Sequence, residues 1–194
     1  TDLQIMRYVQ THTLEDQSNS AAQHARGGME AEYDGVAELW WSSERDLADQ
    51  SSSAALKASA ALLEDEKTFI DLENSPIWFA YEYPQINPAP ETIIASPKSN
   101  IVRVFFPLRH KDSISEDDAR HYWLTHHGPI VRSHAQASGT LCYRQVHRAC
   151  SPMDENLQAA RGTKAKPYLG HAEAWLDRGQ IATDESRLAN AGFK

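Results

Sequence analysis

The sequence predicts an α+β protein built from two related ferredoxin-like units with antiparallel sheets. Three observations lead to this prediction. The chain repeats at a fixed offset of 135 residues, with 12 identities over the 33 positions from Tyr8 to Trp40, where chance would give about two. A Tyr-x-Gln-x-His run and a Gly-x-Ala-Glu-x-Trp run occur in both copies. The predicted elements also follow the order strand, helix, strand, strand, helix, strand that makes up one such unit.

In the first half of the chain, β-branched and aromatic residues predict strands at Gln4 to Thr13 and Tyr33 to Trp41. The polar, glycine-containing segment between them, Leu14 to Glu32, predicts a long loop. Apolar residues at helical spacing predict a helix from Ser53 to Leu72, and a short aromatic strand is expected from Ile77 to Tyr83.

In the second half, Ile101 to Leu108 has the composition of a strand. Ser115 is a suitable helix N-cap and precedes three acidic residues, which favour the positive end of a helix dipole. We therefore expect a helix from Glu116 to His134, kinked or broken at Pro129. The repeated strands, separated by another long loop, are Thr140 to Ala149 and Tyr168 to Leu176.

These elements divide the chain into three parts. Residues 1–84 form a first repeat without its opening strand and helix, and residues 100–194 form a second repeat that is truncated at its end. Residues 85–99 are a linker, because the segment from Pro84 to Ser99 holds four prolines and no periodicity. The missing elements of the first repeat would precede Thr1, so we expect this sequence to be the middle of a longer two-copy protein.

The composition narrows the class of partner. A net charge of -8 argues against nucleic acid and anionic membranes, and no apolar run is long enough to span a bilayer. We expect no signal peptide from the residues at the start of the chain. Cys142 and Cys150 would lie along one strand about 26 Å apart, too far for a disulfide, so free thiols and a cytoplasmic location are expected. We expect a small-molecule partner and leave a homodimer open.

One stretch of the second half has a recognisable pattern. Pro-Leu-Arg is followed by an acidic helix start, then Tyr122-Trp123, then His126-His127-Gly-Pro-Ile-Val. Together with the Tyr-Val-Gln-Thr-His and Tyr-Asp-Gly-Val-Ala-Glu-Leu-Trp-Trp runs of the first half, this pattern resembles the EthD family of the dimeric α+β barrel superfamily. The resemblance implies two four-stranded sheets packed as an α+β barrel around a pocket, here from one chain. It implies no single reaction, because relatives range from aromatic polyketide tailoring enzymes to cofactor-free monooxygenases.

Side-chain alternation groups polar residues on faces of the predicted strands. Arg103 alternates with Val102, Val104 and Phe106, an apolar set that suits contact with helices. We expect the polar faces of all three strands to line one pocket between the sheets. The residues expected there are Arg103; Tyr143, Gln145, His147; His171, Glu173, Trp175; and, from the first copy, Tyr8, Gln10, His12 and Glu38.

The chemistry expected in this pocket is general acid–base catalysis, because imidazole beside a carboxylate titrates near neutral pH. The expected catalytic residues are His147, His171, Glu173 and His127 of the His-Gly-Pro run. His171 stands out because the first copy has Val36 at that position. The substrate-binding residues are expected to be Arg103, Tyr143, Gln145, Trp175, Tyr8, His12 and Glu38.

Several alternatives remain open for these residues. The same Glu and His side chains could serve only to satisfy a buried polar layer, and His127 could cap or brace the helix. His147, His171 and Glu173 also form a set that suits zinc or iron, but any alternating strand produces this spacing, so we expect no metal and no cofactor. The predicted function is dehydration, decarboxylation, isomerisation or cyclisation of an aromatic or polyketide-like substrate. A non-catalytic binding or accessory protein and a cofactor-free monooxygenase are the alternatives.

Overall fold

The computed structural model describes residues 2–15, 18–88, 95 and 99–179, and the chain divides into two compact units, Thr1–Phe69 and Ile70–Lys194. The first unit contains a two-stranded antiparallel sheet, in which β1 pairs with β2. Its elements are β1 (Arg7–His12), α1 (Ser18–Arg26), β2 (Gly35–Trp40), α2 (Glu44–Ala48) and α3 (Ser53–Glu66).

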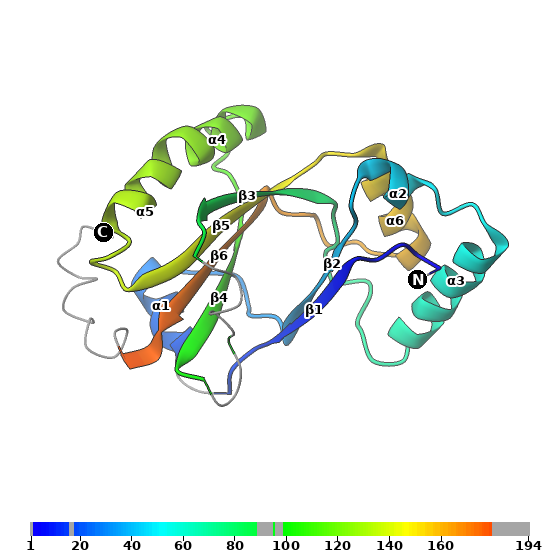
Figure 1. The fold of residues 1–194 in the computed structure, drawn as a ribbon, viewed down its shortest axis with the longest axis horizontal. Coiled ribbons are helices and arrows are strands. Elements are labelled where there is room, and N and C mark those ends of the chain that lie inside the picture. Colours follow the sequence, from blue (N-terminus) through cyan, green and yellow to red (C-terminus); the bar gives the residue numbers. More distant parts are fainter. Residues whose placement is uncertain (1, 16–17, 89–94, 96–98, 180–194) are drawn as a thin grey trace. The chain divides into compact units, whose positions relative to one another are not determined.

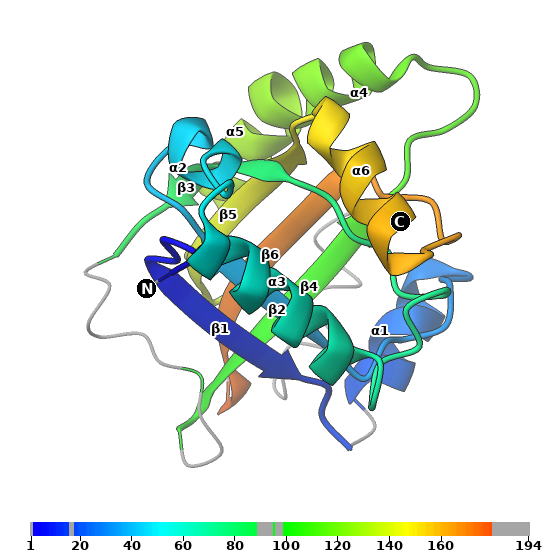
Figure 2. The same ribbon diagram turned by 90° about the vertical axis from the view of Figure 1, so that its right-hand side faces the viewer.

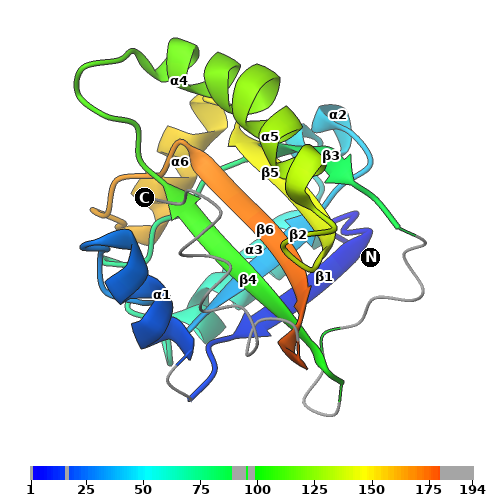
Figure 3. The ribbon, with the colours of Figure 1, turned by 90° about the vertical axis from the view of Figure 1, so that its left-hand side faces the viewer.

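The second unit contains a four-stranded antiparallel sheet in the order β3-β5-β6-β4. Helices α4 and α5 follow one another end to end along one face of this sheet (Figures 1 and 3). Figure 2 shows α6 beyond the end of β5, in the connection to β6. The elements are β3 (Ala80–Ile86), β4 (Ile101–Leu108), α4 (Glu116–Tyr122), the π-helical turn η2 (Trp123–His127), α5 (Gly128–His134), β5 (Thr140–Arg148), α6 (Pro152–Arg161) and β6 (Gly170–Asp177).

The predicted α+β class with antiparallel sheets is confirmed. Each sheet is open within the described residues, because the edge strands do not pair to close it. The expected α+β barrel of two four-stranded sheets is therefore not seen among these residues, where one sheet has two strands and the other has four. The core of the second unit lies between the sheet and its helices and is built around Trp123, Tyr143, Leu169 and Ala172. No helix in the described part of the chain has the length and apolar character needed to cross a membrane.

The repeat in the sequence is also a repeat in strand register. Gln10 lies opposite Ala37 in the first unit, and Gln145 lies opposite Ala172 in the second. All six residue pairs between β1 and β2 recur 135 positions later between β5 and β6. The prediction that these segments form matching strand pairs is therefore confirmed.

The repeated glycine at the start of β2 and β6 allows a close approach between strands. A Cβ atom added to Gly35 would lie 2.5 Å from the carbonyl oxygen of Thr11. A Cβ atom added to Gly170 would collide in the same way with the carbonyl oxygen of Val146, the residue that repeats Thr11. A backbone oxygen in a sheet cannot move aside, so the Gly-x-Ala-Glu-x-Trp run begins with the one residue that fits.

The two predicted loops between the repeated strands are partly wrong, because each contains a helix. Helices α1 and α6 occupy equivalent positions, and each is followed by a glycine in the left-handed region, Gly27 and Gly162. Ser151 caps α6, since its hydroxyl accepts a hydrogen bond from the Met153 amide. These helices were not predicted because their sequences are polar and lack an apolar periodicity. The repeated glycine after each helix is, however, a helix stop signal.

The boundary between the units differs from the predicted linker at residues 85–99. Strand β3, expected in the first repeat, pairs with β5 and belongs to the second unit. Strand pairing over a long sequence separation selected this partner, which local composition does not reveal. Most of the predicted linker, residues 89–94 and 96–98, lies outside the described residues.

The helix expected from Glu116 to His134 is continuous in direction but has a π-helical turn before Pro129. Within that turn the Gly128 amide donates to the carbonyl of Trp123, five residues earlier. Proline lacks an amide hydrogen, and the wider turn accommodates the missing hydrogen bond. The predicted disturbance at Pro129 is therefore a π-turn.

Substitution of Gly170 by alanine tests the close approach. Because the new Cβ would meet backbone atoms of Val146 and His147, we expect Gly170→Ala to lower the free energy of unfolding by about 3 kcal/mol. The matched control is Gly162→Ala, where the φ angle is +69° but the space is empty, and the expected loss is about 1 kcal/mol. Urea unfolding followed by circular dichroism measures both, and equal losses would contradict the steric explanation.

Candidate functional site

The pairing between β5 and β6 places on opposite faces of the sheet two sets of residues that we expected to share one pocket. Gln145 lies opposite Ala172, so Tyr143, Gln145 and His147 lie on the face of the sheet that the helices cover. Glu173 lies opposite Arg144, which places His171, Glu173 and Trp175 on the other face. The prediction that Tyr143, Gln145 and His147 share a pocket with His171 and Glu173 is wrong. Side-chain alternation shows which residues of one strand share a face. The pairing between strands decides which residues of the neighbouring strand lie on that same face.

Arg103, Glu173 and Trp175 share one face of β4 and β6, as expected, and Phe106 lies on the other. Arg103 lies opposite Trp175 and Phe105 opposite Glu173, on the face away from the helices. Phe106, on the other face, packs against the core around Trp123. The sheet therefore has a helix-covered face and an ionic face.

The helix-covered face holds a buried polar cluster formed by Tyr143, Gln145, His147 and Trp123. The Gln145 Nε2 donates to the Trp123 carbonyl oxygen at 2.9 Å, and the Gln145 Oε1 lies 3.0 Å from the His147 Nε2. The indole of Trp123 stacks on the His147 ring with 4.3 Å between centroids, and its Nε1 donates to the Tyr143 hydroxyl. These contacts give the Tyr-x-Gln-x-His run a packing role: it holds η2 on the sheet.

Burial keeps His147 neutral. Loss of solvent, and secondarily the positive charge of Arg120, lowers the pKa of His147 from 6.5 to about 4. A neutral ring that donates from Nε2 to the Gln145 amide satisfies this geometry without a charge. His147 is thereby suited to packing in the core.

The ionic face carries a buried triad that consists of Arg103, Glu173 and His171. Glu173 is fully buried, and its Oε2 accepts a hydrogen bond from the Arg103 guanidinium at 2.5 Å. Its Oε1 lies 3.0 Å from the His171 Nε2. The guanidinium compensates the charge of the buried carboxylate, and the carboxylate in turn orients the imidazole.

Aromatic contacts fix the His171 ring as well. Phe105 stacks on it with 4.0 Å between centroids, and Trp78 makes an edge-type contact with it, with 6.1 Å between centroids. When the Nε2–H donates to Glu173, the nitrogen that can accept a proton is Nδ1. The arrangement is thus that of a base whose tautomer and orientation are set by a carboxylate.

Trp175 lies next to the triad and is enclosed by two cations. The guanidinium carbons of Arg103 and Arg144 lie 4.8 Å and 5.1 Å from its ring centroid. Arg144 also pairs with Glu82 of β3 at 3.1 Å. Trp175 therefore lies on the ionic face, on the same side of β6 as Glu173, as expected from the alternation along the strand.

His127 lies at the junction of η2 and α5 and is half-buried. It occupies the N-cap position of α5, but its side chain makes no capping hydrogen bond there. Its backbone conformation is helical, which is consistent with its place inside a continuous helical segment. Capping by the His127 side chain, one of the alternatives from the sequence, is therefore not supported.

The expected site residues of the first unit are also divided between two faces. Tyr8 and His12 share a face with Leu39, whereas Glu38 lies opposite Val9 on the other face. Tyr8, Gln10 and His12 are exposed in this unit. Tyr8 and His12 therefore do not converge with Glu38.

A metal set of His147, His171 and Glu173 is not formed, because His147 lies on the opposite face of the sheet. Both cysteines are free, Cys142 buried and Cys150 exposed. Sequence reasoning missed Phe105, Trp78, Arg144 and Glu82. Among these, Arg144 carried a signal: it is the repeat counterpart of Val9 and the charged neighbour of Glu173 in register.

Comparison with known proteins identifies the module. Two stretches of the chain, residues 1–73 and 111–184, match the EthD domain. No curated protein and no solved structure matches the chain. The two matched stretches contain the two halves of the repeat, β1–β2 and β5–β6.

The buried state of His147 makes stability depend on pH. Between its unfolded pKa near 6.5 and its folded pKa of about 4, the unfolded chain binds a proton that the folded chain does not. The free energy of unfolding is therefore unaffected by this group above pH 6.5. It decreases as the pH falls towards 4, by about 3 kcal/mol. Urea unfolding of the wild type and His147→Gln at pH 7 and pH 4.5 should show a smaller pH effect in the variant. Replacement of the exposed His126 by glutamine is the control, and equal pH effects in wild type and His147→Gln would contradict the assignment.

Proposed function

The chain belongs to the EthD family, and from that premise we propose that it is a small-molecule enzyme in which His171 is a general base positioned by Glu173. The observation that carries the proposal is the fully buried Glu173 carboxylate, which binds Arg103 with one oxygen and His171 with the other. A carboxylate that orients an imidazole is a recurrent arrangement for proton transfer near neutral pH.

The proposed reaction begins with transfer of a proton from a carbon of the substrate to Nδ1 of His171. The electron pair of the C–H bond moves into an adjacent carbonyl group as an enolate, and the protonated imidazole can return the proton at another atom. Dehydration, isomerisation and cyclisation of an aromatic or polyketide-like compound include such a step. In decarboxylation the enolate forms from the C–C bond as carbon dioxide leaves, and the protonated imidazole supplies the proton that the carbon then takes up. None of these reactions needs an external oxidant or reductant, so the proposal requires no cofactor.

The three members of the triad have different parts in this proposal. His171 moves the proton, and Glu173 stabilises the imidazolium that forms. Arg103 is a positioning residue, because its guanidinium binds Glu173 directly. Arg144, which lies over Trp175 on the same face, is a second cation near the triad and a candidate for binding an anionic group of the substrate.

The duplication supports His171 as the residue that distinguishes the second copy. The equivalent residue in the first copy is Val36, although Glu38 repeats Glu173 and Trp40 repeats Trp175. A valine at this strand position is therefore compatible with the fold. The free thiols of Cys142 and Cys150 support a cytoplasmic location for this activity.

The substitution His171→Val tests the proposal. We expect the variant to fold as the wild type and to lose turnover by about 10²-fold or more, the usual effect of removing a general base. The measurement uses a panel of hydroxyaryl ketones and aromatic β-keto acids, with deuterium incorporation from solvent followed by mass spectrometry beside product formation. Replacement of the exposed His126 by glutamine is the control and should leave turnover unchanged.

Two outcomes would contradict the proposal. Unchanged deuterium incorporation in His171→Val would remove His171 from the reaction. Saturable binding of panel compounds to the wild type without exchange or turnover would favour the accessory, non-catalytic protein instead.

A further inference from the structure

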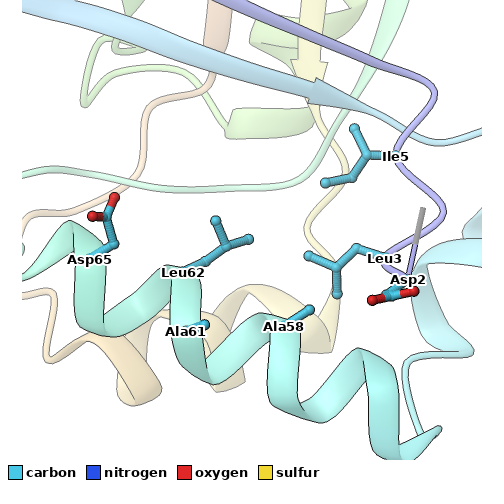
Figure 4. Close-up of a pocket in the computed structure, with 7 residues that line it drawn as sticks. All are labelled: Asp2, Leu3, Ile5, Ala58, Ala61, Leu62 and Asp65. Atoms are coloured by element: carbon cyan, nitrogen blue, oxygen red, sulfur yellow. The ribbon is translucent and has the colours of Figure 1, made fainter.

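The surface of the first unit has an apolar groove that the proposed function does not use. The groove has a volume of about 420 Å³, and Leu3 and Ile5 line one side of it while Leu62 of α3 lines the other (Figure 4). Its lining is mostly aliphatic, and a binding site needs placed polar groups to select a particular ligand. A pair of histidines in the second unit has more specific chemistry.

The histidine pair consists of His121 in the last turn of α4 and His126 in the π-helical turn η2. Both side chains are exposed, and their ring centroids lie 6.5 Å apart. Two imidazoles that each bind one zinc ion at about 2.0–2.1 Å have centroids about 5 to 6.5 Å apart, depending on the angle at the metal. The pair therefore has the separation that two ligands of one ion need.

The π-helical turn brings these two histidines towards the same side of the helix. In a regular α-helix, residues i and i+5 point about 140° apart around the axis. A turn closed by a hydrogen bond between residues i and i+5 holds more residues, and the Gly128 amide, which donates to the Trp123 carbonyl, closes such a turn. His121 and His126 thereby approach the relation that residues i and i+4 have in zinc-binding helices.

Hydrogen bonds determine which nitrogen of His126 carries the lone pair. The Thr125 hydroxyl donates to the His121 carbonyl oxygen at 2.7 Å. Because that hydroxyl has one hydrogen, it accepts from the His126 Nδ1, which lies 2.8 Å away. Nδ1 is therefore protonated, and Nε2 holds the lone pair that a metal ion binds. A hydrogen bond of this kind orients a metal-binding imidazole and makes it a stronger ligand.

Stacking fixes the plane of the His126 ring. The ring of Tyr122 lies parallel to it, with 4.8 Å between centroids and 4° between planes. The His121 ring makes no hydrogen bond to any described residue, so its nitrogens are available to a ligand. One imidazole is thus oriented in advance and the other can rotate towards the ion, which lowers the entropy cost of binding.

We infer that His121 and His126 bind a divalent transition-metal ion such as Zn²⁺ at the exposed surface of the helices. Water molecules complete the coordination, so the ion keeps open positions. Imidazole nitrogens favour zinc, nickel and copper over magnesium and calcium, which prefer oxygen ligands. The site is separate from the proposed catalysis, because the helices cover one face of the sheet and His171 lies on the other.

Isothermal titration calorimetry of the full chain with ZnCl₂ tests the inference, with MgCl₂ as the comparison. We expect one Zn²⁺ per chain and no binding of Mg²⁺. His121→Ala and His126→Ala should each weaken the affinity for Zn²⁺ about ten-fold or more, because one imidazole remains. His134→Ala removes an exposed histidine of α5 and should leave the affinity unchanged.

Substitutions of Thr125 test the assigned tautomer. Thr125→Val removes the hydroxyl and keeps the shape, so it should weaken Zn²⁺ binding about ten-fold, the usual effect of losing such a partner. Thr125→Ser keeps the hydroxyl and should keep the affinity. In NMR spectra of protein labelled with ¹⁵N in histidine, Zn²⁺ should shift the Nε2 resonance of His126 and leave those of His134 in place.

Several results would overturn the inference. One is an affinity for Zn²⁺ that stays unchanged in both His121→Ala and His126→Ala, or that falls equally in His134→Ala. Another is an affinity no greater than that of free imidazole. A third is one Zn²⁺ per two chains with a dimer in size-exclusion chromatography, because the ion would then bridge separate chains.

Discussion

One buried amide determines which face of the larger sheet meets the helices. Gln145 is fully buried, donates to the Trp123 carbonyl and pairs with His147, so its polar atoms are satisfied only when the π-helical turn sits in one place. Gly128 permits that contact, and the Trp123–His147 stack extends it. Because β5 turns Gln145 towards the helices, Arg144 must project to the other side, opposite Glu173.

This orientation separates two kinds of polar chemistry. On the helix-covered face the imidazole of His147 is neutral, since burial lowers its pKa. On the other face the charged groups compensate one another: Arg103 binds Glu173, and Arg144 binds Glu82. A buried ion pair is costly unless its hydrogen bonds are completed, and here the second carboxylate oxygen is completed by His171. The buried packing cluster and the candidate catalytic triad therefore lie on opposite faces of the four-stranded sheet.

The duplication shows which of these features belong to the shared plan. Both copies keep the glycine that permits the close approach of strands, the Tyr-x-Gln-x-His run and the glutamate of β2 and β6, Glu38 and Glu173. Only the second copy adds charge beside that Glu, with Arg144 and His171 where the first copy has Val9 and Val36. The shared residues serve the sheet and, in the second copy, its contact with a helix. The added residues give the second copy its ionic face.

The sequence by itself determined the α+β class, the repeat, the strands near their observed limits and the EthD resemblance, because these depend on local patterns and on identities at a fixed offset. It also placed Arg103, His171, Glu173 and Trp175 on the correct faces of their own strands. Only the tertiary structure decided that His147 lies away from them, that β3 joins the second unit and that polar segments form α1 and α6. The physical reason is that alternation has a period of two within a strand, whereas register between strands is set by contacts between residues far apart in the chain.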